Sequence, residues 1–287
     1  MAPTEERPRT PRWGARGAVL LAIFVMGIVA AIALGLTPAG LVPRTGGLTL
    51  ARDFLAAAFH PALGNSSADP DAAPFLLTVA AAIWRTLIFA VAAISLSLLV
   101  GLPLGILASD RWWAPDVFHR GRLAPLARPM QIALRTLIAC MRSVHELLLA
   151  VIFMAAMGLN TAAAVVAIAI PYAGTLAKVF SEMLDEAPRN SSTALRGLGA
   201  SPLQVFVFGL LPRALPDMAA YAFYRFECAV RSSAILGFFG YPTLGYHLLL
   251  AFEDLRYREV WTYLYALLGL VLLLEWWSAV LRRRFVA

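Results

Sequence analysis

The sequence predicts an all-α membrane protein with six transmembrane helices. Hydrophobic residues make up 60% of its 287 residues and charged residues only 14%. Soluble domains carry about 25% charged residues, so this chain is unusually poor in charge. A membrane-spanning helix needs about 20 mostly apolar residues, and apolar runs long enough for this recur along the chain. The arginines gather between these runs, as expected for loops at a membrane surface.

Six apolar runs are long enough to be spans. The first resembles the apolar part of a signal peptide, but Leu41-Val42-Pro43 is a poor cleavage site, so we expect an uncleaved span. Residues 37–74 are rich in Pro, Gly, Asn, Ser and Asp and are predicted to form a loop. The predicted spans are residues 18–36, 75–108, 131–157, 161–181, 214–239 and 259–281.

Two local patterns bear on how these helices pack. Gly101 and Gly105 form a small-xxx-small pattern near the end of the second span, which permits a close approach of another helix. Pro171 lies inside the fourth span, where a kink is tolerated if neighbouring groups satisfy the freed carbonyl. Both patterns are compatible with a bundle of packed membrane helices.

The arginine distribution predicts the orientation of the chain, because cytosolic segments are enriched in basic residues. With the N-terminus in the cytosol, the outer loops hold only Arg44, Arg52, Arg256 and Arg258. The inner segments hold the rest of the loop arginines, at positions 7–16, 111–128, 189, 196 and 282–284. We therefore expect residues 1–17 to be a cytosolic tail and residues 18–287 a membrane domain whose C-terminus is also cytosolic.

Several function classes are disfavoured. The net charge of +7 comes from residues at the ends of apolar runs, which does not suggest a nucleic-acid-binding face. Cys140 and Cys228 lie inside apolar segments and are interpreted as small core residues. The four histidines are scattered and none forms an H-E-x-x-H pattern, and no G-x-x-x-x-G-K-[ST] loop is present. We therefore predict no catalytic residues, no metal site and no cofactor in this chain.

Residues 193–212 interrupt the apolar pattern between the fourth and fifth spans, on the predicted cytosolic side. Thr193 to Leu198 is compatible with a short helix, and Gly199 is the type of residue that ends a helix in the left-handed conformation. On this chemistry alone, the segment is either an ordinary interfacial turn or a surface that another protein holds.

A second short helix is predicted directly after this glycine. Ser201 is a suitable N-cap, Pro202 suits the first helical position, and Gln204 completes a capping box. We expect Pro212 and Pro216 to end this helix before the fifth span begins.

Ionisable residues inside the spans form a second group of candidates. In the third span, Arg142 and Glu146 are four residues apart and share a face with Gln131 and Arg135. In the fifth span, Glu227 and Arg231 have the same spacing. A charge at the bilayer centre costs about 2.5–3.5 kcal/mol, so such groups normally face a bundle interior or water. They are interpreted either as structural pairs, Arg142 with Glu146 and Glu227 with Arg231, or as a pathway in which arginines contact an oxyanion. The candidate pathway or gate residues are Arg135, Arg142, Ser143, His145, Glu146, Arg225, Glu227, Arg231 and Ser232.

The segment between spans four and five resembles the EAA loop of ABC-importer permeases, E-A-A-x-x-x-G followed nine residues later by a hydrophobe, any residue, Leu and Pro. Thr193 stands in place of the glutamate and Gly209 in place of the hydrophobe, while Gly199, Leu211 and Pro212 match. The resemblance implies that residues 188–212 are a coupling loop that contacts a cytosolic ATPase. The implied contact residues are Thr193, Ala194, Leu195, Arg196, Gly199, Leu211 and Pro212.

A narrower resemblance covers most of residues 130–245. Residues 142–147, R-S-V-H-E-L, are similar to the R-S-I-P-E-L segment of phosphonate-transporter permeases, and residues 224–237 to their Y-R-F-E-x-x-V-R-A-S-x-x-L-G. His145 departs from this pattern by replacing the proline, and residues 238–245 lack the family's G-A-G-G-I-G run.

The resemblance implies a type I ABC-importer permease fold in a bacterial cytoplasmic (inner) membrane. The implied partners are a second permease copy, two cytosolic ATPases that bind ATP and Mg²⁺, and a periplasmic or lipid-anchored binding protein. The implied cargo is a phosphonate or a related oxyanion such as phosphite or hypophosphite. A permease for another small solute stays open, as does pairing with a different permease chain. A self-contained secondary transporter is less favoured because residues 18–130 and 131–281 show no convincing repeat.

Overall fold

The computed structural model describes residues 14–37, 40, 46–64, 74–113, 124–188 and 190–285. Every secondary-structure element within these ranges is a helix. Some residues used in the sequence analysis lie outside these ranges: the arginines at positions 7–12, 44, 120, 122 and 189, and the segment Leu41-Val42-Pro43. The chain divides into two compact units, residues 1–56 and 57–287, which are described separately.

The first unit contains α1 (Gly14–Ala33), which coincides with the predicted first span. Its apolar part, Gly17–Ala33, is shorter than the helices that are long enough to cross a membrane. The prediction of a loop over residues 37–74 is wrong in part, because α2 (Gly47–Ala58) is helical. Apolar residues three or four apart, such as Leu48, Ala51 and Leu55, give this helix one apolar face.

The core of the second unit is the pair formed by α3 (Phe75–Ala108) and α7 (Thr161–Glu186). These helices match the second and fourth predicted spans, and α7 continues through Pro171. The small-xxx-small prediction is confirmed. A methyl group added to Gly105 would meet Phe180 Cβ at 2.9 Å and Ala177 O at 3.0 Å, and one added to Gly101 would meet Ala173 O at 2.9 Å. Glycine is therefore what lets the two backbones approach.

The third predicted span is broken, which corrects the sequence prediction. It consists of α5 (Ala124–Ser143) and α6 (Glu146–Met157), which are bent by 83°. Two local bonds favour the break: Ser143 Oγ donates to Cys140 O at 2.8 Å, and the extended residue His145 caps α6 by accepting the Leu147 N–H at 3.3 Å. Arg142 and Glu146 consequently lie on different helices. Cys140 is exposed and Cys228 half-buried, so the prediction of a core position is wrong for Cys140.

The fifth predicted span starts earlier than expected. The short helix α9 (Pro202–Gln204) continues through the π-helical turn η2 (Val205–Leu210) into α10 (Leu211–Ile235). The expectation that Pro212 and Pro216 end the second short helix is therefore wrong. Pro212 lies just after the π-helical turn, and Pro216 lies inside α10.

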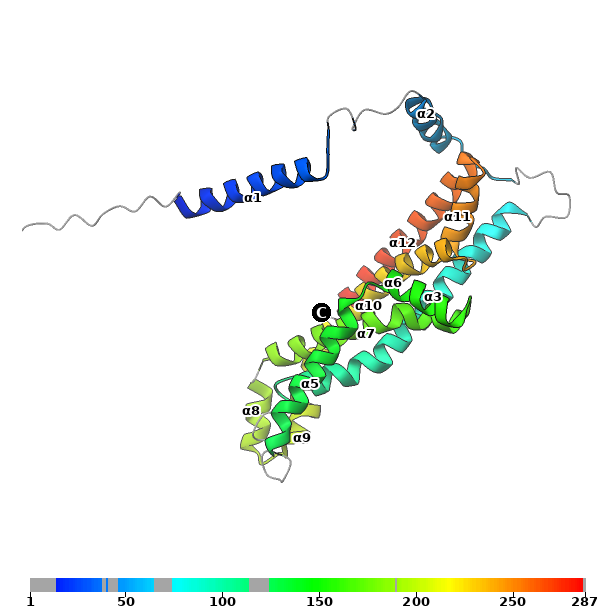
Figure 1. The fold of residues 1–287 in the computed structure, drawn as a ribbon. Coiled ribbons are helices and arrows are strands. Elements are labelled where there is room, and N and C mark those ends of the chain that lie inside the picture. The colour runs from blue at the N-terminus through cyan, green and yellow to red at the C-terminus, as the bar shows by residue number, and fades with distance from the viewer. Residues whose placement is uncertain are drawn as a thin grey trace, which may run out of the picture. The chain divides into compact units, whose positions relative to one another are not determined.

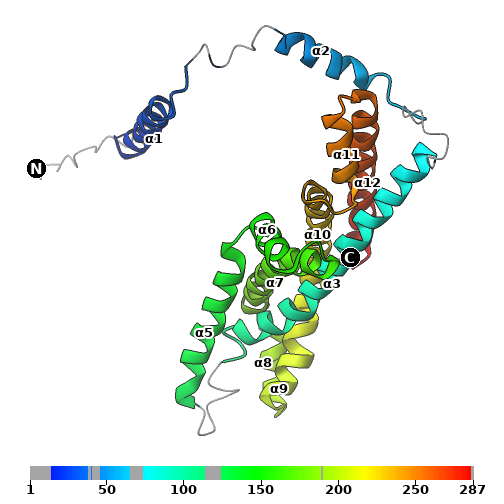
Figure 2. The same ribbon diagram turned by 45° about the vertical axis from the view of Figure 1, so that its right-hand side comes forward.

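The last elements are the 3₁₀ turn η3 (Leu236–Phe239), α11 (Leu244–Glu253) and α12 (Tyr257–Phe285). Figures 1 and 2 show α8 (Asn190–Gly197) and α9 at one end of the second unit and α11 at the other. In the described part of the chain, four helices are long and apolar enough to cross a membrane, and the α5–α6 pair would make a fifth. The six-span count stays a prediction.

Candidate functional site

The predicted coupling loop, residues 188–212, is called the coupling segment. Its first short helix is present as α8, whereas the predicted second helix, α9, is the start of the longer helix that continues into α10. Gly199 has φ +82°, and its N–H bonds to Arg196 O at 2.9 Å. The Ala200 N–H bonds to Leu195 O at 3.1 Å, which completes a Schellman stop for α8. The segment therefore reverses direction at a position that glycine accepts without strain.

The start of α9 is a capping box, as predicted. The Ser201 N–H donates to Gln204 Oε1 at 2.8 Å, and the Gln204 N–H donates back to Ser201 Oγ at 3.4 Å. Pro202 occupies the first helical turn. Because α9 continues into α10, this cap fixes the beginning of one long helix that runs from the coupling segment to Ile235.

Gly209 holds the two arms of the coupling segment together, which the sequence did not reveal. A methyl group at Gly209 would lie 3.1 Å from Leu195 Cδ1 and 3.4 Å from Ser192 Cα, both on α8. The family pattern has a hydrophobic side chain at this position. Here the Leu195 side chain lies against Gly209 and fills the space that such a side chain would take. In the sequence, the only sign of this contact is the glycine itself at position 209.

The turn of the coupling segment exposes apolar side chains. Leu198 is 84% exposed and Leu203 is 55% exposed, on either side of Gly199. Among the predicted contact residues, Leu195 and Leu211 are half-buried, and the exposed ones are Thr193, Ala194, Arg196, Gly199 and Pro212. Both leucine side chains are therefore available for contact with another protein.

A hydrogen-bonded chain connects α6, α7 and α10. Ser232 Oγ on α10 donates to Glu146 Oε1 at 2.9 Å, and Tyr172 OH on α7 lies 2.9 Å from Ser232 Oγ. Because the single Ser232 proton goes to the carboxylate, Tyr172 is the donor to Ser232. The other Glu146 oxygen, Oε2, lies 3.7 Å from His145 Nε2. These contacts bring together Glu146, His145 and Ser232, three of the predicted pathway residues.

Arg225 joins the same cluster. Its guanidinium carbon lies 4.0 Å from the centre of the Tyr172 ring, a cation–π contact. Its Nε is buried and has no hydrogen-bond partner. Asp217, Tyr221, Arg225 and Ser232 follow one another at spacings of four, four and seven residues, which places them on one face of α10.

The two predicted i,i+4 pairs do not form among the described residues. Glu146 bonds to Ser232 instead of Arg142, because the break after Ser143 separates the two helices. Glu227 is 8% exposed and its Oε1 has no hydrogen-bond partner, while the exposed Arg231 contacts Cys228 Sγ at 3.8 Å.

Arg135 lies in a separate cluster where α3, α5 and α7 meet. Its Nη2 lies 3.0 Å from Asp110 Oδ1 and 3.7 Å from Asp185 Oδ2, and its Nε donates to Ala108 O at 3.1 Å. Burial opposes ionisation of Asp110, but the hydrogen bond from Gln131 and the bond and charge of Arg135 outweigh it and lower the pKa of Asp110 below its ordinary value. This cluster ties the ends of α3 and α7 to the middle of α5.

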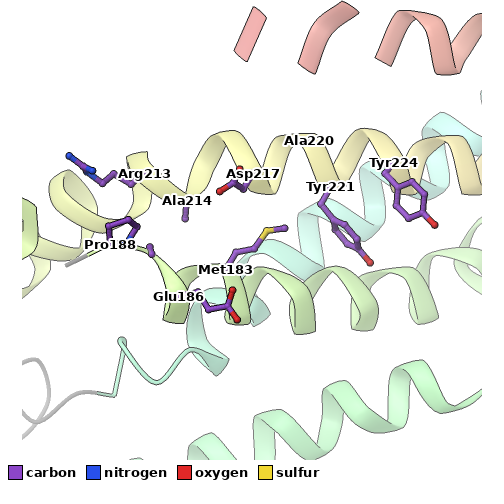
Figure 3. Close-up of a pocket in the computed structure, with 10 residues that line it drawn as sticks. Met183, Glu186, Pro188, Arg213, Ala214, Asp217, Ala220, Tyr221 and Tyr224 are labelled. Carbon is purple, nitrogen blue, oxygen red and sulfur yellow. The ribbon is translucent and has the colours of Figure 1, made fainter. Parts of the chain in front are cut away.

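Two cavities lie against α7. One, of about 620 Å³, lies between the end of α7 and the first half of α10, where Glu186, Asp217, Tyr221 and Tyr224 line it (Figure 3). The other, of about 440 Å³, lies between α5 and α7 and is lined mainly by basic and hydroxyl side chains: Arg135, Arg142, Ser143, Lys178 and Ser181. No group of three or more metal-ligating side chains occurs in the described ranges.

The apolar helices, the bent α5–α6 pair and the capped turn between α8 and α9 define a helical membrane protein. Residues 101–286 match the family described as binding-protein-dependent transport system inner membrane component, and the chain belongs to this family. It is therefore a multi-pass protein of the bacterial cytoplasmic membrane, and the sequence-based family resemblance is confirmed.

Curated relatives include the phosphite transport system permease protein PtxC of Stutzerimonas stutzeri, 34% identical over 53% of this chain and 55% of that protein. The phosphate-import permease protein PhnE of Mycolicibacterium smegmatis is 31% identical over 74% of this chain and 37% of that protein. The chain spans about half the length of the curated relatives it matches.

Solved structures share the fold. A chain of the methionine ABC transporter MetNI, in an inward-facing conformation, superposes with a TM-score of 0.60 at 24% identity, over 73% of this chain and 97% of that chain. A chain of an amino acid ABC transporter with histidines gives 0.61 at 16% identity, over 73% and 95%. The predicted ABC-importer permease fold is therefore confirmed.

Proposed function

We propose that this chain is the permease subunit of an ATP-driven importer that carries a phosphonate or a related phosphorus oxyanion, such as phosphite or hypophosphite. The observation that carries the proposal is the coupling segment, which presents exposed leucines at a capped turn directly before α10. The names of the relatives support the cargo class, because PtxC is a phosphite permease and PhnE a phosphate-import permease.

The geometry supports a mechanical role for the coupling segment. Residues 202–235 form one continuous helix from α9 to the end of α10, so a displacement of its start is transmitted to Arg225 and Ser232. An ATPase that holds the segment would thus change the contacts of the polar cluster when it closes on ATP. Two packed arrangements that differ modestly in energy suffice for this coupling.

The polar face of α10 supports an anionic cargo. Arg142 lines the cavity between α5 and α7, and Arg225 lies 4.0 Å from the centre of the Tyr172 ring on α7, so guanidinium groups approach α7 from both α5 and α10. Guanidinium groups bind carboxylate and phosphate oxygens through paired hydrogen bonds. Arg142, Arg225 and Ser232 are therefore our proposed pathway residues. Ser143, His145, Glu146, Glu227 and Arg231 remain proposed members of the pathway or its gate.

The proposed complex contains two copies of this permease and two cytosolic ATPases, which bind ATP and Mg²⁺. A periplasmic or lipid-anchored binding protein delivers the cargo. The proposed ATPase contacts are Thr193, Ala194, Leu195, Arg196, Gly199, Leu211 and Pro212. In this proposal, ATP is hydrolysed by the separate ATPase and not by the permease chain.

Uptake by reconstituted vesicles tests this proposal. The permease is reconstituted into proteoliposomes with the ATPase and the binding protein of its transport system. Uptake of phosphite, methylphosphonate, phosphate and a dipeptide is then measured with and without ATP. We expect ATP-dependent uptake of at least one phosphorus oxyanion and none of the dipeptide. Uptake of the dipeptide alone, or uptake driven by an ion gradient without ATP, would overturn the proposal.

A further inference from the structure

The Glu146 carboxylate accepts a hydrogen bond from a donor that would equally suit an oxyanion. It is the hydrogen-bond acceptor at the end of the chain from Tyr172 through Ser232, with both O···O distances at 2.9 Å. Ser232 is 7% exposed and Tyr172 is 3% exposed, so both hydroxyl groups are turned away from bulk solvent. A carboxylate oxygen and a phosphorus oxyanion oxygen make equivalent demands on such donors, because both are charged acceptors of short hydrogen bonds.

Arg225 adds a positive charge that no carboxylate of the described residues neutralises by an ion pair. Its guanidinium lies on the Tyr172 ring at 4.0 Å, and no carboxylate lies within ion-pair distance of it in the described ranges. Its Nε donor is buried without a partner. A buried donor without a partner is rare in proteins and requires an explanation, such as a ligand that binds there transiently.

We propose that Tyr172, Arg225 and Ser232 form an oxyanion site inside the membrane domain, that Glu146 fills this site at rest, and that the transported oxyanion displaces Glu146. This inference rests on the proposed function, since the displacing anion is the cargo. It assigns a role to Tyr172, which sequence reasoning did not single out, and gives Glu146 the role of an internal competitor.

The broken third span is what makes such a displacement possible. Glu146 is in the first turn of α6, directly after the 83° break, so its side chain is not held by a preceding helical turn. An alternative partner is already close, since His145 Nε2 lies 3.7 Å from Glu146 Oε2. The carboxylate can therefore move toward His145 when an anion accepts the hydrogen bond from Ser232.

Phosphorus-31 NMR tests the site directly. The permease–ATPase complex, purified without the binding protein, is titrated with phosphite, and the line width of phosphite gives its dissociation constant. Glu146→Gln keeps the shape of the side chain but removes the competing charge, so we expect phosphite to bind about tenfold more tightly than to the wild type. Arg225→Gln is expected to weaken binding by about tenfold or more, and Tyr172→Phe by a smaller factor.

Glu253→Gln is the matched control, because it removes the same charge from an exposed position at the end of α11. Thermal melting of each variant establishes that it is folded, and Ser232→Ala replaces any variant that is not. Equal phosphite affinity in the wild type and Glu146→Gln, or unchanged affinity in Arg225→Gln, would overturn the site while the uptake assay still supports the proposed function. If the variants behave as expected but the wild-type complex carries no phosphorus oxyanion, the proposed function fails and the displacing anion is not the cargo.

Discussion

Gly105 shows how single residues determine the packing of α3 on α7. An added methyl group would lie 2.9 Å from Phe180 Cβ, so Gly105→Ala forces the helices apart. Overpacking of this kind costs about 1–3 kcal/mol, and we expect a lower melting temperature in detergent. Gly269→Ala is the control, since nothing lies within 4 Å of a methyl group there and alanine favours the helix by about 1 kcal/mol. Equal melting temperatures for the two variants would contradict the packing account.

Asp110 provides a second prediction at the residue scale. Burial raises its pKa, but the contacts with Gln131 and Arg135 outweigh this and hold the pKa below the ordinary value of 3.8. The stabilisation from the ionised carboxylate is therefore complete above pH 3.8 and is lost as the pH falls through the lowered pKa. Melting temperatures at pH 7 and pH 3 should consequently differ more for the wild type than for Asp110→Asn. The same difference in both proteins would show that these contacts do not affect stability.

At the scale of elements, features with local causes could be predicted from the sequence. The stop at Gly199, the capping box from Ser201 to Gln204 and the close approach at Gly101 and Gly105 are each encoded within a few residues, and all are present. The long helices α3, α7 and α12 are apolar enough to be recognised by composition alone.

Other elements depend on contacts between distant residues and could not be predicted. The break at His145 separates Arg142 from Glu146, and an apolar pattern alone did not distinguish a bent pair from one straight span. The helix through Pro212 persists because a π-helical turn precedes it, which a single proline does not indicate. Tyr172 could not be linked to Ser232 because 60 residues separate them.

The contact between α8 and η2 leads to a prediction for the coupling segment. A leucine at Gly209 would collide with Leu195, whose Cδ1 would lie 3.1 Å from the new Cβ. We expect Gly209→Leu to separate the two arms and to reduce co-purification of the ATPase with the permease by severalfold. Gly197→Leu adds the same side chain to α8 where nothing lies within 4 Å, and it should retain the ATPase. Loss of the ATPase in both variants, or in neither, would contradict this role of Gly209.

At the scale of the whole molecule, the proposed importer needs a separate ATPase. Leu198 and Leu203 are exposed at the coupling turn, and the chain has no G-x-x-x-x-G-K-[ST] loop of its own. We therefore expect native mass spectrometry of the co-expressed complex to show two permease and two ATPase chains. The purified permease alone should show no ATP hydrolysis. A stable complex with a different ratio would contradict the proposed assembly.

The central claim is that the coupling segment transmits the work of a separate ATPase to the membrane helices. Its most direct test is the number of phosphite ions taken up per ATP hydrolysed in proteoliposomes that contain the complete complex. Valine at Gly199 is strained because φ is +82°, at a cost of about 1–2 kcal/mol. The account predicts that Gly199→Val inserts into the membrane normally but takes up about tenfold less phosphite per ATP, while Gly197→Val matches the wild type. An unchanged ratio in Gly199→Val would contradict the account.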